Sequence, residues 1–320
     1  MTARIGITES NLGDVEIGRK REMWSKVQEQ LATHVCVPRT VGLLEQYTEG
    51  DTEKVNSFTP SFALPQGLLE EFDASILLGP QLRRDAEHRK TVLPLPLLPL
   101  RYVGGVDITY VKGTNLAVAC LVIMEYPAMR VCRTIFHQCE VTEPYIPGFL
   151  AFREVVPLVE LIKKIRVESC EEETPAYPQL LLVDGCGVQH PLRCGLASHV
   201  GVILDIPTIG CAKKFMAVDG MTRESMHLLF ETNADDAHEA KKESLAPLVK
   251  PMIGRSGALW GYAATPNPSV RNPIFISPGH RVGYAEAAAL ALSMCKYRVP
   301  EPIRVADLSS RDYIRRMNLR

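Results

Sequence analysis

Residues 180–199, LLLVDGCGVQHPLRCGLASH, carry a short apolar run that ends at Asp184, a Gly-x-Gly pair and a histidine. An apolar run of this length, closed by turn-forming glycines, predicts a strand buried in a parallel sheet. Ligands of α/β proteins bind at the carboxyl ends of such strands, so Asp184 is expected at the edge of a site. Gly185 and Gly187 would let the backbone approach a phosphate or a metal ion there. A plain VDG turn without a chemical role is the competing interpretation.

The segments around this strand predict an α/β fold. Composition and spacing indicate five strands, at 102–111, 116–126, 129–141, 179–185 and 206–212. The first three have the spacing of an antiparallel meander. Helical periods are found at 16–35, 147–166 and 192–204. A meander followed by helix, strand, helix and strand forms a mixed sheet flanked by helices.

The composition is that of a globular protein in a reducing compartment. The chain has 320 residues, 46% hydrophobic and 23% charged, and its net charge of -1 gives no global argument for a polyanionic partner. The 301–320 segment is locally basic. Nine cysteines without a C-x-x-C pair indicate free thiols, and no apolar stretch reaches the length of a membrane span. We expect one domain over 1–320, with 37–92 as an insertion or linking region.

A second strand aspartate makes a metal site the better interpretation of Asp184. Asp107 lies in VGGVDITY between Val106 and Ile108, so its side chain points to the opposite face of the strand from theirs. Taken alone, Asp107 is equally well explained as a strand residue satisfied by backbone donors. Two aspartates delivered by one sheet are costly unless a cation lies between them, and hard oxygen ligands favour Mg²⁺ or Mn²⁺.

Four further side chains are candidates for the same site. Glu154, on the helix at 147–166, would supply a third carboxylate, although a solvated surface glutamate is the simpler interpretation. His190 and His280 could position or protonate groups near a metal ion, and Lys213 could meet a phosphate as a point charge. Structural histidines and a solvated lysine remain the alternatives.

A zinc site is the rival metal interpretation. Cys186, His190 and Cys194 have the spacing C-x₃-H-x₃-C, with His199 as a fourth ligand. It is the weaker prediction, because the following segment has a helical pattern and Asp184 would have no role.

The sequence PYIPG at 144–148 predicts a stiff loop that presents Tyr145 just before a helix. The ring either packs as part of a helix-start turn or serves as an apolar tip that enters a stack of bases.

These motifs together resemble the endonuclease V family, nucleases directed at deoxyinosine and inosine. The resemblance rests on VGGVDITY at 103–110, PYIPGFLAFRE at 144–154, the segment from LLVDGCG to GCAKK at 181–214, and SPGH at 277–280. It covers about residues 100 to 310 and implies a ribonuclease H-like fold with a mixed five-stranded sheet. Within LLVDGCG, the family often has His or Asn at the position of Cys186, which bears on pocket preference. The 37–92 region is longer than the family pattern.

The resemblance also implies roles for single residues. Asp107, Asp184 and Glu154 would bind the metal, Mg²⁺ with Mn²⁺ able to substitute. The implied catalytic residues are Asp107, Glu154, Asp184, Lys213, His280 and His190. Tyr145 would be a wedge, and Gly185 and Gly187 would line a hypoxanthine pocket. The implied nucleic-acid-binding residues are Tyr145, Pro144, Ile146, Pro147, Gly148, Arg153, Gly185 and Gly187.

The activity implied by the resemblance is hydrolysis of the second phosphodiester bond 3′ to inosine, leaving a 5′-phosphate. The C-terminal KYRVPEPIRVADLSSRDYIRR resembles the animal branch, which favours single-stranded RNA over deoxyinosine-containing DNA. A monomer in the cytoplasm and nucleus, including the nucleolus, is expected. Two alternatives stay open: a non-catalytic inosine-binding module, and a ribonuclease H-like nuclease for other damaged or branched DNA.

Overall fold

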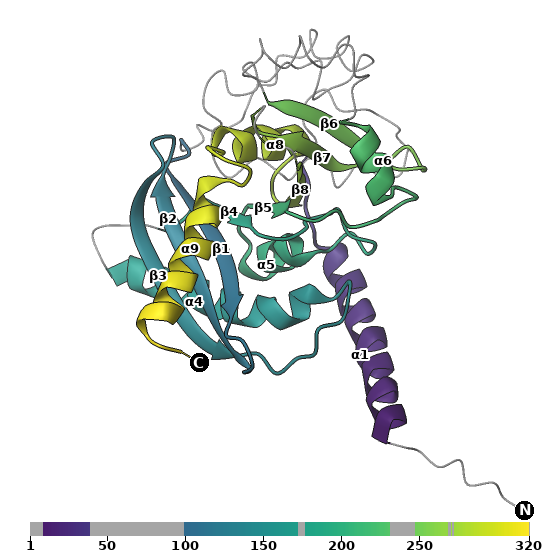
Figure 1. Ribbon diagram of the computed structural model, residues 1–320. Coiled ribbons are helices and arrows are strands. Elements are labelled where there is room, and N and C mark those ends of the chain that lie inside the picture. Colours follow the sequence, from purple (N-terminus) through teal and green to yellow (C-terminus); the bar gives the residue numbers. More distant parts are fainter. Residues whose placement is uncertain are drawn as a thin grey trace, which may run out of the picture.

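The computed structural model describes residues 9–38, 99–171, 177–230, 247–267, 270 and 272–319 (Figure 1). The expected insertion at 37–92 lies outside the described residues except for its first two positions. One sheet, covered by helices on both faces, organises the part that is described.

The sheet has the order β3-β2-β1-β4-β5-β8-β7-β6. Its strands are β1 (Tyr102–Tyr110), β2 (Leu116–Glu125), β3 (Arg130–Glu140), β4 (Leu180–Val183), β5 (Thr208–Ala212), β6 (Leu248–Ile253), β7 (Leu259–Thr265) and β8 (Ile274–His280). The β1-β4 and β4-β5 pairs are parallel, and the other pairs are antiparallel. The mixed sheet is confirmed, but the count of five strands is wrong, since β6, β7 and β8 extend it to eight in the described residues. Pro251 in β6 and Gly261 in β7 weaken the strand signal of that region.

Helices from different parts of the chain cover the two faces. One face carries α4 (Leu150–Glu171) and α5 (Leu196–Leu204), which bury residues such as Leu121 and Leu181 of the sheet. The other face carries α8 (Tyr284–Ser293) and α9 (Glu301–Arg316), which pack over Val122 and Leu182. This alternation along each strand follows from the two-residue period of β structure, and each fully buried aliphatic side chain contributes about 1.5–3 kcal/mol.

Two further helices lie at the periphery. The amphipathic helix predicted at 16–35 is α1 (Glu9–Ala32), which projects from the body next to α5, and α6 (Arg223–Leu228) lies beside β6 and β7 (Figure 1). Trp24 of α1 is buried and stacks on Phe152 of α4, with ring centroids 4.8 Å apart. None of the helices in the described ranges has the length and apolar character needed to cross a membrane.

The buried face of α4 is turned from the one that simple helical spacing predicts. That spacing would bury Phe149, Phe152, Val156, Val159 and Ile162, but Phe149 and Phe152 are half-buried and Val156 is 57% exposed. Val155 and Leu158 face the sheet in its place. Successive helical residues are about 100° apart, so a stripe centred on these two residues turns Val156 to solvent.

The unequal lengths of neighbouring strands create the place for a site. β1 pairs with β4 only from Val103 to Val106, because β4 ends at Val183 while β1 continues to Tyr110. Beyond Val106, the side of β1 that pairs with β4 has no described strand beside it. Side chains from both faces can therefore meet there, which a continuous strand ladder would prevent.

Candidate active site

Asp107 and Asp184 lie side by side at the carboxyl ends of two adjacent parallel strands. Val106 pairs with Val183 in the register of β1 and β4, so the next residue on each strand is an aspartate at the same level. Burial and the negative charge of Asp184 together raise the pKa of Asp107 to about 6. The structure therefore brings the two predicted acids together at a partly buried position, where their negative charges repel each other.

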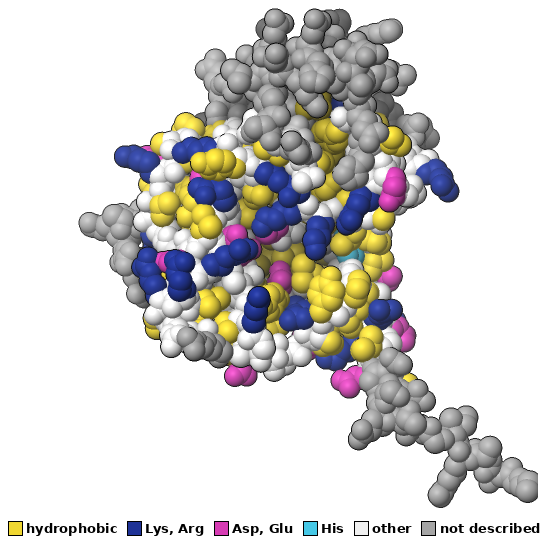
Figure 2. Space-filling view, in the orientation of Figure 1, with side chains coloured by type: hydrophobic (Ala, Val, Ile, Leu, Met, Phe, Trp, Pro, Cys, Tyr) yellow, Lys and Arg dark blue, Asp and Glu magenta, His cyan; other side chains and the backbone are white. Residues whose placement is uncertain are grey.

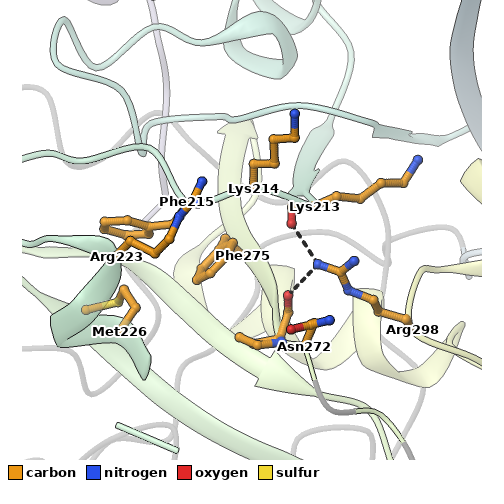
Figure 3. A pocket seen from close by; sticks show the side chains of 9 residues that line it. Lys213, Lys214, Phe215, Arg223, Met226, Asn272, Phe275 and Arg298 are labelled. Carbon is orange, nitrogen blue, oxygen red and sulfur yellow. Dashed lines mark hydrogen bonds between the residues drawn. The ribbon is translucent and has the colours of Figure 1, made fainter. Parts of the chain in front are cut away.

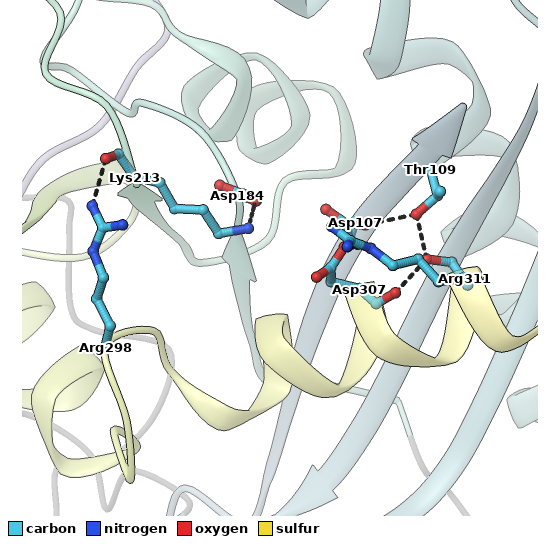
Figure 4. A network of polar contacts seen from close by, with 8 residues as sticks. Asp107, Thr109, Asp184, Lys213, Arg298, Asp307 and Arg311 are labelled. Atoms are coloured by element: carbon cyan, nitrogen blue, oxygen red, sulfur yellow. Dashed lines mark hydrogen bonds and ion pairs between the residues drawn. The ribbon is translucent and has the colours of Figure 1, made fainter. Parts of the chain in front are cut away.

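A third acid, Asp307 of α9, faces Asp107 and was absent from the predicted site (Figure 4). α9 packs so closely on β1 that a Cβ at Gly105 would lie 2.0 Å from the carbonyl carbon of Pro302. Five residues of helix and two of strand each advance about 7 Å, which brings Asp307 level with Asp107. The charge of Asp307 also raises the pKa of Asp107.

Polar contacts fix α9 at this position. The hydroxyls of Thr109 on β1 and Ser310 on α9 are 2.6 Å apart. Arg311 donates from Nε to the Oδ1 of Asp307 at 2.8 Å, while Thr109 donates to Asp107 over 3.4 Å. In the sequence, Asp307 lies in the locally basic 301–320 segment, where no motif marks it as part of a site. Its one available signal was its place next to Ala306, within the buried stripe of an amphipathic helix.

Glu154 reaches the same opening from the other face of the sheet. Its side chain is buried, and its Oε1 accepts a hydrogen bond of 3.0 Å from the hydroxyl of Tyr110. Burial, together with repulsion from Asp107 and Asp184, raises the pKa of Glu154 to about 7 even though the hydrogen bond from Tyr110 lowers it. The interpretation of Glu154 as a solvated surface residue is therefore wrong.

Lys213 provides the positive charge nearest to the acids. It follows β5, and its Nζ lies 2.5 Å from the Oδ2 of Asp184 (Figure 4). Burial alone would lower the pKa of Lys213, but the ion pair with Asp184 outweighs burial and raises it. The Nη2 of Arg298 donates to the carbonyl of Lys213 at 2.7 Å and so holds the backbone of this residue in place.

The four carboxyl groups are suited to a hard divalent cation. In the described part of the chain, no three His, Cys, Asp or Glu side chains are close enough to form a complete metal cage. Burial, and with it the repulsion between neighbouring carboxylates, nevertheless raises the pKa values of Asp107 and Glu154. Carboxylate oxygens in this state favour Mg²⁺ or Mn²⁺, which would replace the protons.

His190 bonds to backbone atoms on both sides of its ring and holds the PYIPG loop. It is buried, its Nε2 lies 2.7 Å from the carbonyl oxygen of Gly148, and its Nδ1 accepts from the backbone of Leu192. Both ring nitrogens are thus already engaged, which makes the zinc interpretation with Cys186 and Cys194 wrong for this structure. His190 positions the loop and has no contact with the acids.

His280 is at the opposite edge of the sheet, which corrects its expected place in the active site. In the antiparallel β5-β8 pair it stands next to Thr208, the first residue of β5, whereas Lys213 follows the last. The length of β5 therefore separates them, roughly 13 Å. The Nδ1 of His280 accepts from the backbone N–H of Cys36, and Asp205 lies 3.4 Å from its Nε2. The motif SPGH marks a strand end, but the direction of β8 was needed to identify which end.

The residues expected to touch nucleic acid divide into exposed and buried ones. In the loop at 144–148, Tyr145 is 65% exposed and Pro147 is exposed, while Ile146 is only 2% exposed and belongs to the core. Gly148 has a φ of +86°, which an L side chain rarely adopts, and Pro144 is half-buried. The loop thus presents Tyr145 by burying its neighbour Ile146, so Ile146 is not available as a contact.

Gly187 and Arg153 have structural partners of their own. A Cβ at Gly187 would lie 1.9 Å from the carbonyl oxygen of Pro278, and the Gly187 N–H donates to Ser277. That N–H is therefore not available to a base, while Gly185 is half-buried next to Asp184. Arg153 places its guanidinium 4.8 Å from the ring centre of Tyr110, supporting the residue that contacts Glu154.

The sequence of the whole region matches a known family. A sequence model described as Endonuclease V matches residues 84–308. The chain belongs to the endonuclease V family. Endonuclease V of Mus musculus is 39% identical over 222 residues, 68% of this chain and 61% of the mouse protein. Endonuclease V of Homo sapiens is also 39% identical over 222 residues, 68% of this chain and 73% of the human protein. The chain thus spans 61% of the length of its mouse relative.

A solved family structure shares the fold. Endonuclease V of Ciona intestinalis, in complex with a 24mer DNA containing an inosine followed by a ribo-adenosine, superposes with a TM-score of 0.66 at 25% identity. The superposition covers 93% of this chain and 99% of that one. The ribonuclease H-like fold and the membership of the animal branch, both predicted from sequence, are confirmed.

Proposed function

We propose that this protein is a metal-dependent endonuclease that cleaves single-stranded RNA at the second phosphodiester bond 3′ to inosine and leaves a 5′-phosphate. Deoxyinosine in DNA is a second substrate. The observation that carries the proposal is the gathering of Asp107, Asp184, Glu154 and Asp307 at one open end of the sheet, with raised pKa values for Asp107 and Glu154. Carboxyl groups that are buried close to one another lower the stability of the folded protein and are typical of catalytic sites.

The chemistry proposed is hydrolysis of a phosphodiester by an activated water. A bound Mg²⁺, held by Asp107 and Asp184 with Glu154 and Asp307, would supply Lewis acidity and lower the pKa of water. Lys213 stands next to Asp184 and would offset the negative charge that develops on the phosphate oxygens. Tyr110 orients Glu154 through its hydrogen bond, and Thr109 fixes α9 over the acids.

Recognition of inosine is proposed at the PYIPG side of the acids. The exposed ring of Tyr145 is suited to stacking on or between bases, and His190 with Gly148 keeps the loop stiff. The 6-oxo group of hypoxanthine accepts a hydrogen bond where the amine of adenine donates one, so a backbone N–H would distinguish the two. RNA is the proposed preferred substrate because the chain is 39% identical to the mouse and human proteins and the Ciona ligand has a ribonucleotide next to its inosine. We place this activity in the cytoplasm and nucleus.

A cleavage assay tests this proposal directly. Matched strands of inosine RNA, deoxyinosine DNA and both unmodified controls are incubated with the protein and Mg²⁺, and products are mapped at nucleotide resolution. We expect a single cut, one nucleotide beyond inosine, that requires Mg²⁺ and is lost in Asp107→Ala and Asp184→Ala. Equal cutting of strands without inosine would favour a nuclease of other specificity. Inosine-dependent binding without any product, even with Mn²⁺, would favour a binding module.

A further inference from the structure

A cavity of about 300 Å³ opens next to the acids, on the far side of Lys213. It lies where four chain segments meet: the residues after β5, helix α6, the start of β8 with the residues before it, and the turn that leads into α9 (Figure 3). Lys213 borders both this cavity and Asp184, so the two sites are continuous. The proposed cleavage mechanism uses Lys213 but none of the other side chains that line this cavity.

The rim of the cavity is positively charged. Lys213, Lys214, Arg223 and Arg298 all line it, and none of the described lining residues is acidic. Lys214 and Arg223 are exposed, so their charged groups are free to move toward a ligand. On this face of the molecule, Lys and Arg side chains surround the few acidic ones (Figure 2). Four cations around one opening specify an anionic ligand.

Arg298 shows that the rim is built into the fold. Its Nη2 donates to the carbonyl of Lys213 at 2.7 Å and to the carbonyl of Pro273 at 2.9 Å, joining the chain at the ends of β5 and β8 (Figure 3). Its Nε is buried and has no hydrogen-bond partner among the described residues. A buried donor of this kind costs stability until an acceptor meets it.

The interior of the cavity is apolar. Phe215 and Phe275 have ring centroids 5.2 Å apart at an interplanar angle of 59°, and Met226 of α6 lies next to them. An anion such as free phosphate would use the charged rim but gain nothing from these side chains. A nucleotide matches both parts, because its phosphate meets the lysine and arginine groups while its sugar or base covers the apolar wall.

We propose that this cavity binds the nucleotide next to the cleaved phosphodiester bond of the substrate strand, with Lys214 and Arg223 as its phosphate contacts. The inference rests on the proposed function, which puts the cleaved phosphate next to Lys213 and Asp184. A strand carries one phosphate per nucleotide, so a chain that leaves this position past Lys213 brings its next phosphate to the rim of the cavity. Tyr145 and the cavity would then hold the strand on two sides of the cut.

Two variants and one control test the cavity. Lys214→Gln and Arg223→Gln remove one exposed charge each, and Lys163→Gln removes an exposed lysine from α4, more than two turns beyond Glu154. Steady-state cleavage of an inosine RNA is measured at several salt concentrations. We expect each cavity variant to raise KM about tenfold with kcat within about twofold of wild type. The salt dependence of KM should become less steep by about one unit per variant, and Lys163→Gln should change neither quantity.

A set of substrates with single neutral linkages locates the contact. Each RNA carries one methylphosphonate at a successive position on either side of the cut, and each is tested with wild type and with the Lys214→Gln, Arg223→Gln double variant. One linkage, directly next to the cut, should raise KM for wild type and have no further effect on the double variant. This position also shows on which side of the cut the cavity acts.

The outcomes separate this inference from the proposed function. A wild-type protein that cuts no inosine strand contradicts the proposed function itself. A wild-type protein that cuts normally, with both cavity variants equal to it, overturns the cavity alone. The cavity is also overturned if the double variant keeps the same pattern of sensitive linkages as wild type, or if Lys163→Gln weakens binding as much as Arg223→Gln.

Discussion

The central strands carry ionisable side chains at both of their ends, but the two ends arrange charge in opposite ways. We call the end with Asp107 and Asp184 the acid edge. At the carboxyl ends of β1 and β4, Asp107, Asp184, Glu154 and Asp307 meet, with Lys213 paired to Asp184 and Arg311 paired to Asp307. At the amino end of β5, Arg281 donates two hydrogen bonds of 2.7 and 2.9 Å to Asp205, which His280 also contacts.

The acid edge is suited to catalysis, whereas the end with His280 stabilises the fold. At the edge with His280, every charge has an opposite partner, and the ion pair with Arg281 contributes to a lowered pKa of Asp205 despite some burial. At the acid edge, burial and like charges raise the pKa values of Asp107 and Glu154. Paired charges mark an edge that holds the fold together, whereas crowded like charges mark an edge maintained for function at a cost in stability.

The largest expected effect comes from neutralising the paired strand acids. Asp107→Asn and Asp184→Asn should each reduce single-turnover cleavage on the order of 10³-fold or more, because each removes a metal-binding oxygen. Asp107→Asn should leave the Tm in the presence of EDTA unchanged or higher, since it removes a repulsive charge. A fall in Tm with cleavage retained would show that the acid edge is structural like the other one.

Asp307 tests whether a helix belongs to the acid edge. Asp307→Asn should reduce cleavage on the order of 10²-fold at limiting Mg²⁺ and weaken the apparent affinity for Mg²⁺. Ser310→Ala is the matched control, because it removes the contact between α9 and Thr109 and the bond to the backbone carbonyl of Asp307 but leaves every carboxyl group in place. The control should lower the free energy of unfolding by about 1 kcal/mol and keep cleavage at 25 °C. Similar losses of activity in both variants would reduce Asp307 to a role in docking α9.

The raised pKa values predict opposite pH trends for stability and activity. The pKa of Asp107 is about 6 and that of Glu154 about 7, against about 4 for unfolded carboxyls. Between pH 4 and 7 the folded chain therefore binds more protons, so in EDTA its free energy of unfolding should fall as pH rises through this window. Chemical denaturation of wild type and Asp107→Asn measures this trend, which should be smaller in the variant.

Cleavage should rise through the same range of pH. Protons and Mg²⁺ compete for the same carboxylate oxygens. At limiting Mg²⁺, each acid whose pKa lies above the pH should therefore contribute an increase in cleavage rate of about tenfold per pH unit. Saturating Mg²⁺ should move the rise to lower pH. A rise whose midpoint is independent of Mg²⁺ would argue against metal binding by these carboxyls.

At the opposite edge, stability should change and chemistry should not. His280→Ala leaves the buried N–H of Cys36 without its acceptor and should lower the free energy of unfolding by about 1–3 kcal/mol. Cleavage per folded molecule should stay within about twofold of wild type at 20 °C. The assay is run beside a denaturant titration, and a loss of kcat without loss of stability would restore a catalytic role for His280.

The smallest effect is expected at the support of Glu154. Tyr110→Phe removes the hydrogen bond that lowers the pKa of Glu154, so that pKa should rise. Activity at pH 7 should fall a few-fold and recover at higher pH, where Glu154 is ionised again. A uniform loss across the whole pH profile would mean that the ring of Tyr110 acts by packing and not through this bond.

The sequence by itself determined the local elements and much of the acid edge. Period and composition identified the meander, the buried strand ending at Asp184 and the helix bearing Glu154, and an aspartate inside a β-rich segment identified Asp107. These signals are local, because the two-residue period of a strand fixes which side chains share a face. PYIPG likewise predicted a stiff loop, since two prolines restrict the backbone whatever surrounds them.

Only the tertiary structure decided which charges share an edge. Asp307 is 200 residues from Asp107 in the chain and joins it because α9 crosses β1 at Gly105. His280 lies at the end of the sheet opposite the acids because β8 runs antiparallel to β5. No local sequence pattern distinguishes that strand direction from its reverse. Strand register and helix crossing are set by packing between distant segments, so local sequence identified the ionisable residues while the assembled sheet selected the ones that meet.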